Sequence, residues 1–559
     1  MRIFFLLLLI PAYCFSQIDE SVFTQKLDNG LTCIVIENPV VPLVNIEWVV
    51  KGGTDYEPSA RKGFTQLLTQ LFFSANKDYP SAEEAANRIK QIGGVTGTSV
   101  SNEHGSVYLT CSKRNIDNAL KIFLSAVRQP LFVSEEVDSA LSVLLSNAAQ
   151  IQGDPNFMLD EALNKNLWAE KPAQMKSSLI TSAIGRYASP ENLAVFQKLF
   201  FSPNNSCIIV SGDVQHKDVF QKLVTVFGPL PRNPQMPTDV YQPYEFSSLN
   251  LSSQFVMEDA QVQSPLLVIS FPVDDIRVNP YAAHIGEFLE ALVNASSSSL
   301  NKNLFNAGLA DQVSARYRQM KFGSSFEFII APRIDKLGEC YTQARKEIEA
   351  LANFGSYTSD QLKQASQLMY STYAYKTENA IALSHYIGEQ WAKTDKVPAL
   401  NIDDELKRMQ SLNEVINFCQ LNFLQRNMTA GLLISTQQKN SYNINATFTQ
   451  TFSVDAYQIS FTRNDDQVFD LQNKEQVNSF SQLLKINPQL KIELIAEQDA
   501  AERKETAKAR FLSVYKSLSS SGVPEEVLDA MTVSLYIRHA ESDEEMHNNM
   551  IVHFKIAAQ

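Results

Sequence analysis

One short stretch of the chain combines a helical apolar pattern with polar side chains at the spacing of a metal site. Between Gly63 and Phe73, apolar residues recur at positions i, i+3, i+4, i+7 and i+8, which predicts an amphipathic helix. A hydrolytic metal site on such a helix uses two histidines four residues apart, with a glutamate beside them as general base. The corresponding positions here are Gln66, Thr69 and Gln70. Amides and a hydroxyl supply no imidazole nitrogen and do not titrate near neutral pH. The sequence therefore predicts a helix that neither binds zinc nor provides a general base.

The other candidate ligands and nucleophiles do not form a second motif. The seven histidines are scattered; the nearest approach to half a motif is His284 with Glu287 three residues later, and no second histidine follows. We interpret His284 as an ordinary core or surface residue. The chain also contains no Gly-rich phosphate loop and no Gly-x-Ser-x-Gly nucleophile turn.

The composition is that of a globular protein with an acidic surface. Of 559 residues, 44% are hydrophobic and 10% aromatic, and the net charge is -13. The length predicts several domains. The negative charge disfavours nucleic acid or an anionic membrane surface as a partner, because both are themselves negatively charged.

The first residues predict export from the cytoplasm. Arg2 precedes an apolar run and small residues, which is typical of a secretory signal, and we expect cleavage after Ser16. The apolar run is too short to cross a bilayer, and no later run is long enough, so we expect no transmembrane span. Lipidation at Cys14 is the alternative, which the bulky Tyr13 before it disfavours.

The remaining cysteines do not suggest a disulfide framework or a zinc site. They are odd in number and far apart, and three of them fall in strand-like apolar runs. We therefore expect single buried thiols. The five residues are Cys33, Cys111, Cys207, Cys340 and Cys419.

The apolar pattern divides most of the chain into two similar halves. The first extends from a strand-like run at residues 32–36 to a continuous apolar run at residues 206–212. Five prolines between Pro229 and Pro243 predict a linker. Past it a similar order restarts with residues 266–271 and ends on the apolar run 430–435. This pattern is typical of a degenerate tandem duplication.

A third, smaller unit follows, in which strand and helix signals alternate from about residue 455 onward. We therefore predict an α+β protein with two tandem halves and a small C-terminal two-layer α/β domain. The expected division is a signal peptide at residues 1–16, halves at 17–235 and 236–445, and the last domain at 446–559.

A series of short motifs occurs in a fixed order between residues 23 and 437. They are Leu27-Asp28-Asn29-Gly30-Leu31, Gly52-Gly53-Thr54 with Glu57, the helix after Gly63, Gly93-Gly94 with Thr98, Asp154-Pro155, residues 206–212, Gln263-Ser264-Pro265, Ser297-Ser298-Ser299-Leu300 and Gly308-Leu309. In these motifs the chain resembles the insulinase/pitrilysin-like metallopeptidase family. The resemblance implies two halves, each with a mainly antiparallel sheet covered by helices, that form one clam-like subunit.

Position by position, the resemblance implies that the catalytic set of the family is replaced. The two zinc-binding histidines fall on Gln66 and Gln70, and the catalytic glutamate on Thr69. The third ligand, a glutamate, falls on Asn147 in the helix expected at residues 134–152. We therefore expect a pseudo-peptidase without a metal or other cofactor.

The second half of active members also supplies an arginine and a tyrosine that position the substrate carbonyl. These two positions fall near Phe305 and Asp311. Arg316 and Tyr317 lie close by in the sequence, and we interpret them as ordinary strand residues.

The last unit resembles the peptidoglycan-binding domain of outer-membrane protein A and its relatives. In that family an aspartate and an arginine clamp the diaminopimelate of the peptide stem, because a zwitterion needs a carboxylate for its ammonium and a guanidinium for its carboxylate. Here the pair is Asp499 and Arg510. The residues that carry the resemblance are Ile459-Ser460-Phe461 with Asn464, residues 483–494, Asp499, Arg510, Asn548-Asn549 and Val552.

The clamp places a condition on the structure. Asp499 is expected in the loop after the strand at residues 490–495, and the next helix must start late, near Glu502 or Lys504. A helix that began at Ala500 would carry Arg510 roughly 15 Å along its axis, too far to share one small ligand. The alternative is a decayed domain kept for protein contacts.

Together these observations predict a noncatalytic, periplasmic scaffold subunit from a Gram-negative bacterium. Its expected partner is another peptidase-family subunit or an outer-membrane or envelope complex, with peptidoglycan as a further partner of the last domain. Two alternatives stay open: a peptide-binding, chaperone-like subunit, which an apolar accessible chamber would favour, and an active metallopeptidase that uses other residues.

Overall fold

The computed structural model of the chain describes most of the two halves and parts of the last domain. The described residues are 21–57, 61–168, 179–234, 253–441 except 277, 280, 322, 399–401, 410, 425 and 427, then 458–462, 477, 480–481, 484, 492–499, 504–529, 531–538 and 549–556. Contacts divide the chain into two compact units: residues 1–245, 257–425 and 431–443 form the first, and residues 246–256, 426–430 and 444–559 form the second.

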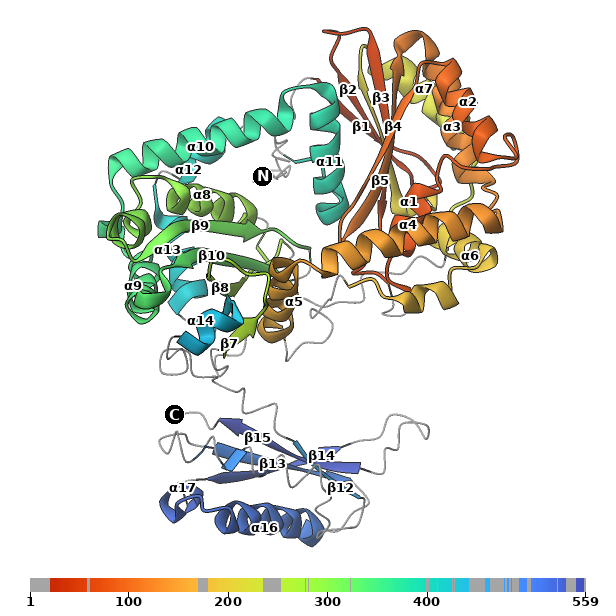
Figure 1. The fold of residues 1–559 in the computed structure, drawn as a ribbon. Helices are drawn as coiled ribbons and strands as arrows, with labels where there is room; N and C mark the ends of the chain where they lie inside the picture. Colours follow the sequence, from red (N-terminus) through yellow and green to blue (C-terminus); the bar gives the residue numbers. More distant parts are fainter. Residues whose placement is uncertain are drawn as a thin grey trace, which may run out of the picture. The chain divides into compact units, whose positions relative to one another are not determined.

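The first half is built on a six-stranded sheet with the order β1-β2-β6-β3-β5-β4 (Figure 1). Its strands are β1 (Val22–Lys26), β2 (Thr32–Glu37), β3 (Leu43–Lys51), β4 (Val95–Val100), β5 (His104–Ser112) and β6 (Ser206–Gly212). β6 enters between β2 and β3 and runs parallel to β2 but antiparallel to β3. The sheet is therefore mixed rather than purely antiparallel, because the long helical connection before β6 allows a parallel pairing that a hairpin could not make.

The second half repeats this topology in a five-stranded sheet. Its strands are β7 (Ser253–Glu258), β8 (Leu266–Val273), β9 (Ala310–Arg318), β10 (Ser324–Pro332) and β11 (Thr429–Ile434). Their order, β7-β11-β8-β10-β9, matches β2-β6-β3-β5-β4 position by position. In the first sheet the last strand, β6, enters between β2 and β3, and in the second the last strand, β11, enters between the corresponding β7 and β8, as expected of a tandem duplication.

Helices account for most of the remaining described chain. The first half contains α1 (Phe64–Gln70), α2 (Ala82–Gln91), α3 (Ile116–Arg128), α4 (Ser134–Gln152), α5 (Pro155–Leu167), α6 (Pro190–Phe200) and α7 (His216–Phe227). The second contains α8 (Ala282–Asn294), α9 (Leu337–Ala350), α10 (Ser359–Thr377), α11 (Ala380–Thr394), α12 (Ile402–Met409), α13 (Asn413–Cys419) and α14 (Thr436–Ser441). Among the described residues, no helix is both long and apolar enough to span a membrane.

Local sequence signals explain where several helices begin. The side chain of Asp154 accepts a hydrogen bond from the Asn156 amide, and Pro155 occupies the first turn of α5, where its missing N–H costs nothing. Thr358 and Gln361 form a reciprocal capping box at the start of α10.

The main core of the first half lies on one face of its sheet. Alternate residues of β3, among them Trp48 and Val50, point to this face, where they pack with residues of α1, α3, α6 and α7. The predicted buried thiols are confirmed: all five cysteines are free and buried. Burial raises the pKa of Cys33 to about 12 and that of Cys111 to about 11.

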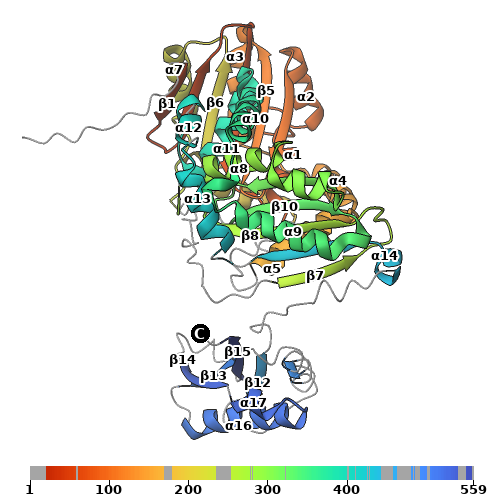
Figure 2. The ribbon, with the colours of Figure 1, turned by 90° about the vertical axis from the view of Figure 1, so that its left-hand side faces the viewer.

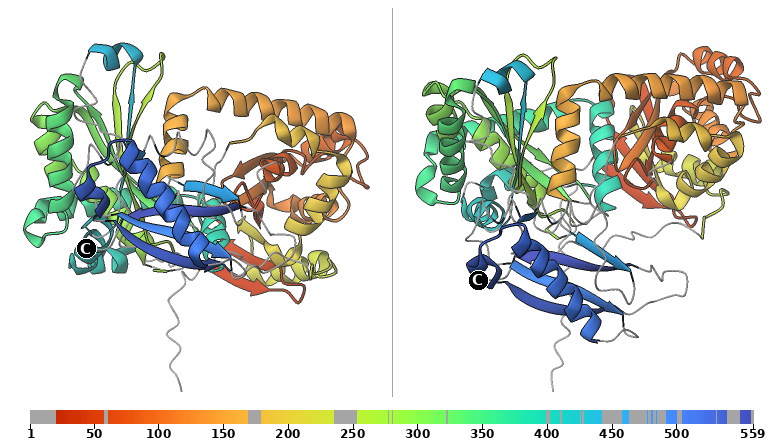
Figure 3. Two further views of the ribbon diagram at one scale, coloured as in Figure 1. Left: turned by 90° about the horizontal axis from the view of Figure 1, so that it is seen from below. Right: turned by 60° about the horizontal axis from the view of Figure 1, so that its bottom comes forward.

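One helix of each half packs against the sheet of the other half. α11, although it follows the second sheet in the sequence, covers the opposite face of the first sheet, where Ile387, Trp391 and Ala392 pack against residues of β2, β3 and β6. In return α5 contacts β8 of the second sheet. Figures 1 and 3 show both crossings, with α5 beside the green strands and α11 beside the red ones.

The last unit contains a four-stranded sheet with the order β12-β15-β13-β14. Its elements are β12 (Gln458–Thr462), β13 (Ile492–Asp499), α16 (Lys504–Ser520), α17 (Glu525–Asp529), β14 (Thr532–Arg538) and β15 (Asn549–Ile556). Within this sheet, as far as the structure describes it, β13 and β14 pair in parallel and the other two pairings are antiparallel; α16 packs on β13 (Figure 2). The expected boundaries near residues 235 and 445, the signal peptide and most of the linker lie outside the described residues.

A first prediction concerns α1, whose apolar side is part of the core while Gln70 is exposed. Replacing the buried Leu68 by alanine should lower the free energy of unfolding by about 2–5 kcal/mol, because a cavity remains in a packed core. The exposed control Gln70→Ala should change it by less than about 0.5 kcal/mol. Urea unfolding followed by circular dichroism measures both, and equal losses would contradict this assignment of the two sides.

Candidate functional site

The start of α1 is held by a buried carboxylate. Glu57 accepts hydrogen bonds from the backbone amides of Gly63 and Thr65, each at 2.6 Å, and from the Thr65 hydroxyl, also at 2.6 Å. Burial raises the pKa of Glu57, although these hydrogen bonds act in the opposite direction. The carboxylate thus caps a helix whose preceding residue, Gly63, has the left-handed φ of +100° and offers no capping side chain.

The glycines before α1 allow this close arrangement. The Gly53 amide donates to the Thr65 hydroxyl at 2.9 Å, and Gly53 has a φ of +102°. A Cβ atom at Gly53 would lie 2.4 Å from the Ser101 carbonyl oxygen. Gly53 and Glu57 therefore position the start of α1 through Gly63 and Thr65. The side chains of Gln66, Thr69 and Gln70 take no part in these contacts.

The four positions that the resemblance assigns to catalysis lie on two helices that pack together, α1 and α4. Thr69 is buried, and its hydroxyl donates to the carbonyl oxygen of Gln66 at 2.9 Å. Gln66 is half-buried, while Gln70 and Asn147 are exposed. The two helices meet through Leu144 of α4, whose Cδ2 would lie 3.2 Å from a Cβ placed at Gly63.

These donors do not fit a zinc ion. Zinc sites in proteins use imidazole nitrogen, thiolate sulfur and carboxylate oxygen, whereas the four side chains here are three amides and a hydroxyl already engaged within the helix. Within the part of the chain that the structure describes, no three His, Cys, Asp or Glu side chains gather into a group that could hold a metal.

The resemblance places the substrate-positioning arginine and tyrosine near Phe305 and Asp311, and these two side chains have neither chemistry. Phe305 is 50% exposed on a short π-helical turn, and Asp311 at the start of β9 pairs with Arg333 at 3.0 Å. Arg316 and Tyr317 do lie in a strand, β9, as predicted.

Arg316 also belongs to an ion-pair network, which was not predicted from the sequence. Arg316 contacts Glu327 at 2.6 Å and Asp160 of α5 at 3.2 Å, and Arg318 pairs with the same two carboxylates. Since Asp160 belongs to the first half and β9 to the second, the network joins the two halves. Glu327 is almost fully buried, so its two arginines are required to offset its desolvation.

A second polar contact between the halves lies under α11. Glu47 on β3 is buried, and it accepts hydrogen bonds from the Ser384 hydroxyl at 2.7 Å and from His385 Nδ1 at 2.8 Å. The hydrogen bond to Glu47 raises the pKa of His385.

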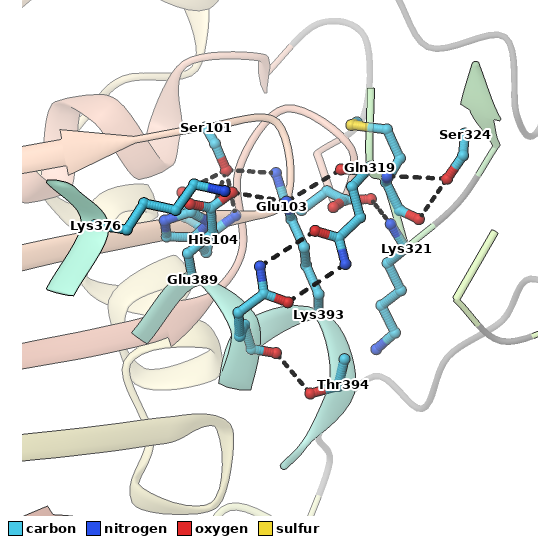
Figure 4. Close-up of polar contacts among 12 residues, drawn as sticks. Ser101, Glu103, His104, Gln319, Lys321, Ser324, Lys376, Glu389, Lys393 and Thr394 are labelled. Carbon is cyan, nitrogen blue, oxygen red and sulfur yellow. Dashed lines mark hydrogen bonds and ion pairs between the residues drawn. The ribbon is translucent and has the colours of Figure 1, made fainter. Parts of the chain in front are cut away.

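A third junction, shown in Figure 4, joins the β4–β5 turn to the β9–β10 turn and α11. The Glu103 carboxylate accepts from the Lys321 amide at 2.6 Å, and Gln319 and Gln390 exchange amide hydrogen bonds at 3.2 and 3.3 Å. Lys393 donates to the Gln319 carbonyl oxygen at 3.0 Å and to Glu389 at 2.7 Å. Burial lowers the pKa of His104 nearby, whose Nδ1 lies 2.8 Å from the Ser101 hydroxyl.

Two cavities lie among the helices next to this junction. One of about 380 Å³ is enclosed by α8, α10, α11, α12 and β9, and the other, of about 470 Å³, by α8, α11 and the residues that follow α11. His284 and Glu287, the isolated half-motif of the sequence, line both. Periodicity alone could have placed them on one face of α8, but not beside a cavity.

The structure also locates Asp499 and Arg510. Asp499 is the last residue of β13 rather than a loop residue, because the strand continues past Ile495 in parallel register with β14. Within the described residues α16 begins at Lys504, which meets the late start that a shared ligand requires. Arg510 is 0% exposed, so a ligand could contact it only by displacing what covers it.

The fold of two duplicated α+β halves, with a helix motif of the zinc-peptidase type at α1, defines the class of the protein. A family model described as insulinase (peptidase family M16) matches residues 32–180, and the model of the inactive domain of the same family matches residues 187–369. The chain therefore belongs to the insulinase family of peptidases.

Individual relatives are distant. An uncharacterized zinc protease from Rickettsia felis is 24% identical over 211 residues, which are 38% of this chain and 51% of that protein. A probable alpha-2 subunit of the mitochondrial-processing peptidase from Arabidopsis thaliana is 26% identical over 215 residues, covering 38% and 42%. The chain thus spans about half the length of these relatives. The first half of the periplasmic protease PqqL from Escherichia coli superposes with a TM-score of 0.62 at 15% identity, covering 76% of this chain and 94% of that structure.

A second prediction concerns the Glu47–His385 contact. Because the folded-state pKa of His385 is raised, its charged contact stabilises the protein fully below about pH 6.5, and this contribution is lost as the pH rises through the folded pKa. His385→Gln should therefore lower the melting temperature more at about pH 6 than at about pH 9.

The control is the same substitution in a Glu47→Gln background, where its effect should not depend on pH. His104 has the opposite shift but is present in all the variants, so its contribution cancels. An equal effect of His385→Gln at both pH values in the wild-type background would refute the charged contact.

Proposed function

We propose that the chain is a noncatalytic insulinase-family subunit that acts as a scaffold in the periplasm of a Gram-negative bacterium. The observation that carries the proposal is that α1 has a packed core side and a Glu57 cap, while the positions to which the resemblance assigns zinc binding and proton transfer hold Gln66, Thr69, Gln70 and Asn147. A helix that packs in the core but carries no titratable side chain at these positions can support the fold without binding zinc or transferring a proton.

The proposed partner is a second peptidase-family chain or an outer-membrane or envelope complex. Three features support it: one relative is named as a subunit of a processing peptidase, another is named as periplasmic, and the first sixteen residues have the pattern of a secretory signal. The peptide-binding alternative would be favoured by an apolar chamber, but both cavities carry several charged side chains.

The C-terminal unit is proposed to tether this scaffold to peptidoglycan. Asp499 ends β13, and Arg510 lies six residues after Lys504, the first residue of α16, which places it only about 9 Å along the helix axis from that start at 1.5 Å per residue. This separation is compatible with one carboxylate and one guanidinium addressing the two charges of a zwitterionic amino acid.

A third prediction tests the noncatalytic assignment. The purified protein should hold well below one zinc per chain by elemental analysis and should cleave no fluorogenic peptide, because amides are poor zinc ligands. The matched control is a variant with Gln66→His, Thr69→Glu, Gln70→His and Asn147→Glu, which should gain zinc if the four positions converge. One tightly held zinc per wild-type chain, lost in Gln66→Ala, would overturn the assignment.

A fourth prediction tests the tether by sedimentation with purified peptidoglycan. The wild type should pellet, whereas Asp499→Ala and Arg510→Lys should stay in the supernatant, since each loses one arm of the clamp. Arg510→Lys is preferred to alanine because the side chain is fully buried. The exposed Lys516→Ala on the same helix is the control and should pellet. Wild type that stays in solution, or variants that pellet equally, would leave the unit as a protein-docking module.

A further inference from the structure

The cavity of about 380 Å³ between α8, α10, α11, α12 and β9 has the size of a small-molecule site. Its wall is acidic and aromatic. The residues concerned are Glu287, Glu290, Glu405, Lys376, Tyr317 and Tyr386, which give three carboxylates against one ammonium group. Arg408, outside the lining, pairs with Glu405 at 2.8 Å, and Lys376 pairs with Glu287, so Glu290 is the carboxylate of the three that can still attract a cation.

Two polar groups in this wall lack protein partners within the described residues. Glu290 accepts a hydrogen bond from the Tyr317 amide at 2.8 Å through one carboxylate oxygen, and its other oxygen accepts none. The Tyr317 hydroxyl, which belongs to the same lining, is buried and has no hydrogen-bond partner among the described residues. Because buried polar groups are normally satisfied, an unpaired hydroxyl beside a cavity indicates a binding site.

The charges already present show where a ligand cation would lie. Lys376 is used by Glu287, to which it donates at 2.9 Å, and its ammonium lies 5.6 Å from the centroid of the Tyr386 ring. Glu290 forms no ion pair among the described residues, because Lys376 pairs with Glu287 and Arg316 pairs with Glu327 and Asp160, and burial raises the pKa of Glu290. An ammonium beside Glu290 would supply the missing counter-ion, and the rings of Tyr317 and Tyr386 would add cation–π attraction.

We propose that this cavity binds the ammonium group of an amine, either a free diamine or a lysine side chain of a peptide. Glu290 is the counter-ion, and the Tyr386 hydroxyl and His284 complete the hydrogen bonds of the ammonium group. The second cavity shares His284, Glu287, Gln319 and Tyr386 with the first, so the rest of the ligand can extend into it. This activity is separate from the scaffold role and does not depend on it.

Titration calorimetry of the full chain tests the proposal, with putrescine and the blocked tripeptide Ala-Lys-Ala as probes and blocked Ala-Gln-Ala as control. About 150 mM salt suppresses nonspecific attraction to the acidic surface. At least one amine probe should bind saturably. Glu290→Gln should weaken that binding by about tenfold or more, and Tyr386→Phe by a smaller factor. Glu349→Gln, on α9 away from the cavity, should bind as the wild type does.

The outcomes separate the two sources of the amine. Binding of putrescine alone supports a small-molecule site, and binding of the lysine peptide supports a peptide side-chain site. Absence of binding by both probes, equal binding of Ala-Gln-Ala, or an unchanged affinity in Glu290→Gln would each overturn the proposal. Should Glu290→Gln melt well below the wild type, Tyr386→Phe, which keeps the ring and removes only the hydroxyl, decides in its place.

Discussion

The packing of α11 on the far face of the first sheet is the contact on which the arrangement of the two halves depends. A Cβ at Gly388 would lie 2.9 Å from Val49 and 3.3 Å from Ile209, so the helix lies as close to the sheet as a glycine allows. Beneath it, Glu47 is buried and depends on Ser384 and His385 of α11 for its hydrogen bonds. Replacing Ser384 and His385 by apolar residues would leave this buried carboxylate without these two partners, which is costly.

Because α11 belongs in sequence to the second half, its packing on the first sheet also connects the second half to the first. It sets the direction of the α10–α11 pair and thereby encloses both cavities, while Asp160 of α5 makes the reverse connection to Arg316 and Arg318. The exchange of helices explains how a duplicated chain forms one compact unit. Neither crossing uses Gln66, Thr69 or Gln70 of α1, so the arrangement of the halves does not depend on the side chains at these positions.

Local signals in the sequence predicted much of the secondary structure. The helix expected at residues 134–152 and the strand at 206–212 have those bounds in α4 and β6, since each has a long uniform pattern with clear ends. The insertion of β6 beside β2, the crossings of α5 and α11 and the cavity beside His284 were not predictable, because they arise from contacts between distant segments. Asp499 was expected in a loop because the apolar run ends at Ile495. The strand continues to Asp499 because it pairs with β14, which the sequence pattern does not show.

The central claim, a scaffold in an envelope assembly, is tested most directly by isolating the tagged chain from its native membrane fraction under mild conditions. Size-exclusion chromatography with light scattering and mass spectrometry of the eluted complex would give its mass and composition. The account predicts a complex well above the 62.7 kDa of one chain, with a defined envelope or peptidase-family partner in constant ratio. Recovery of a free monomer that cleaves peptides would contradict it.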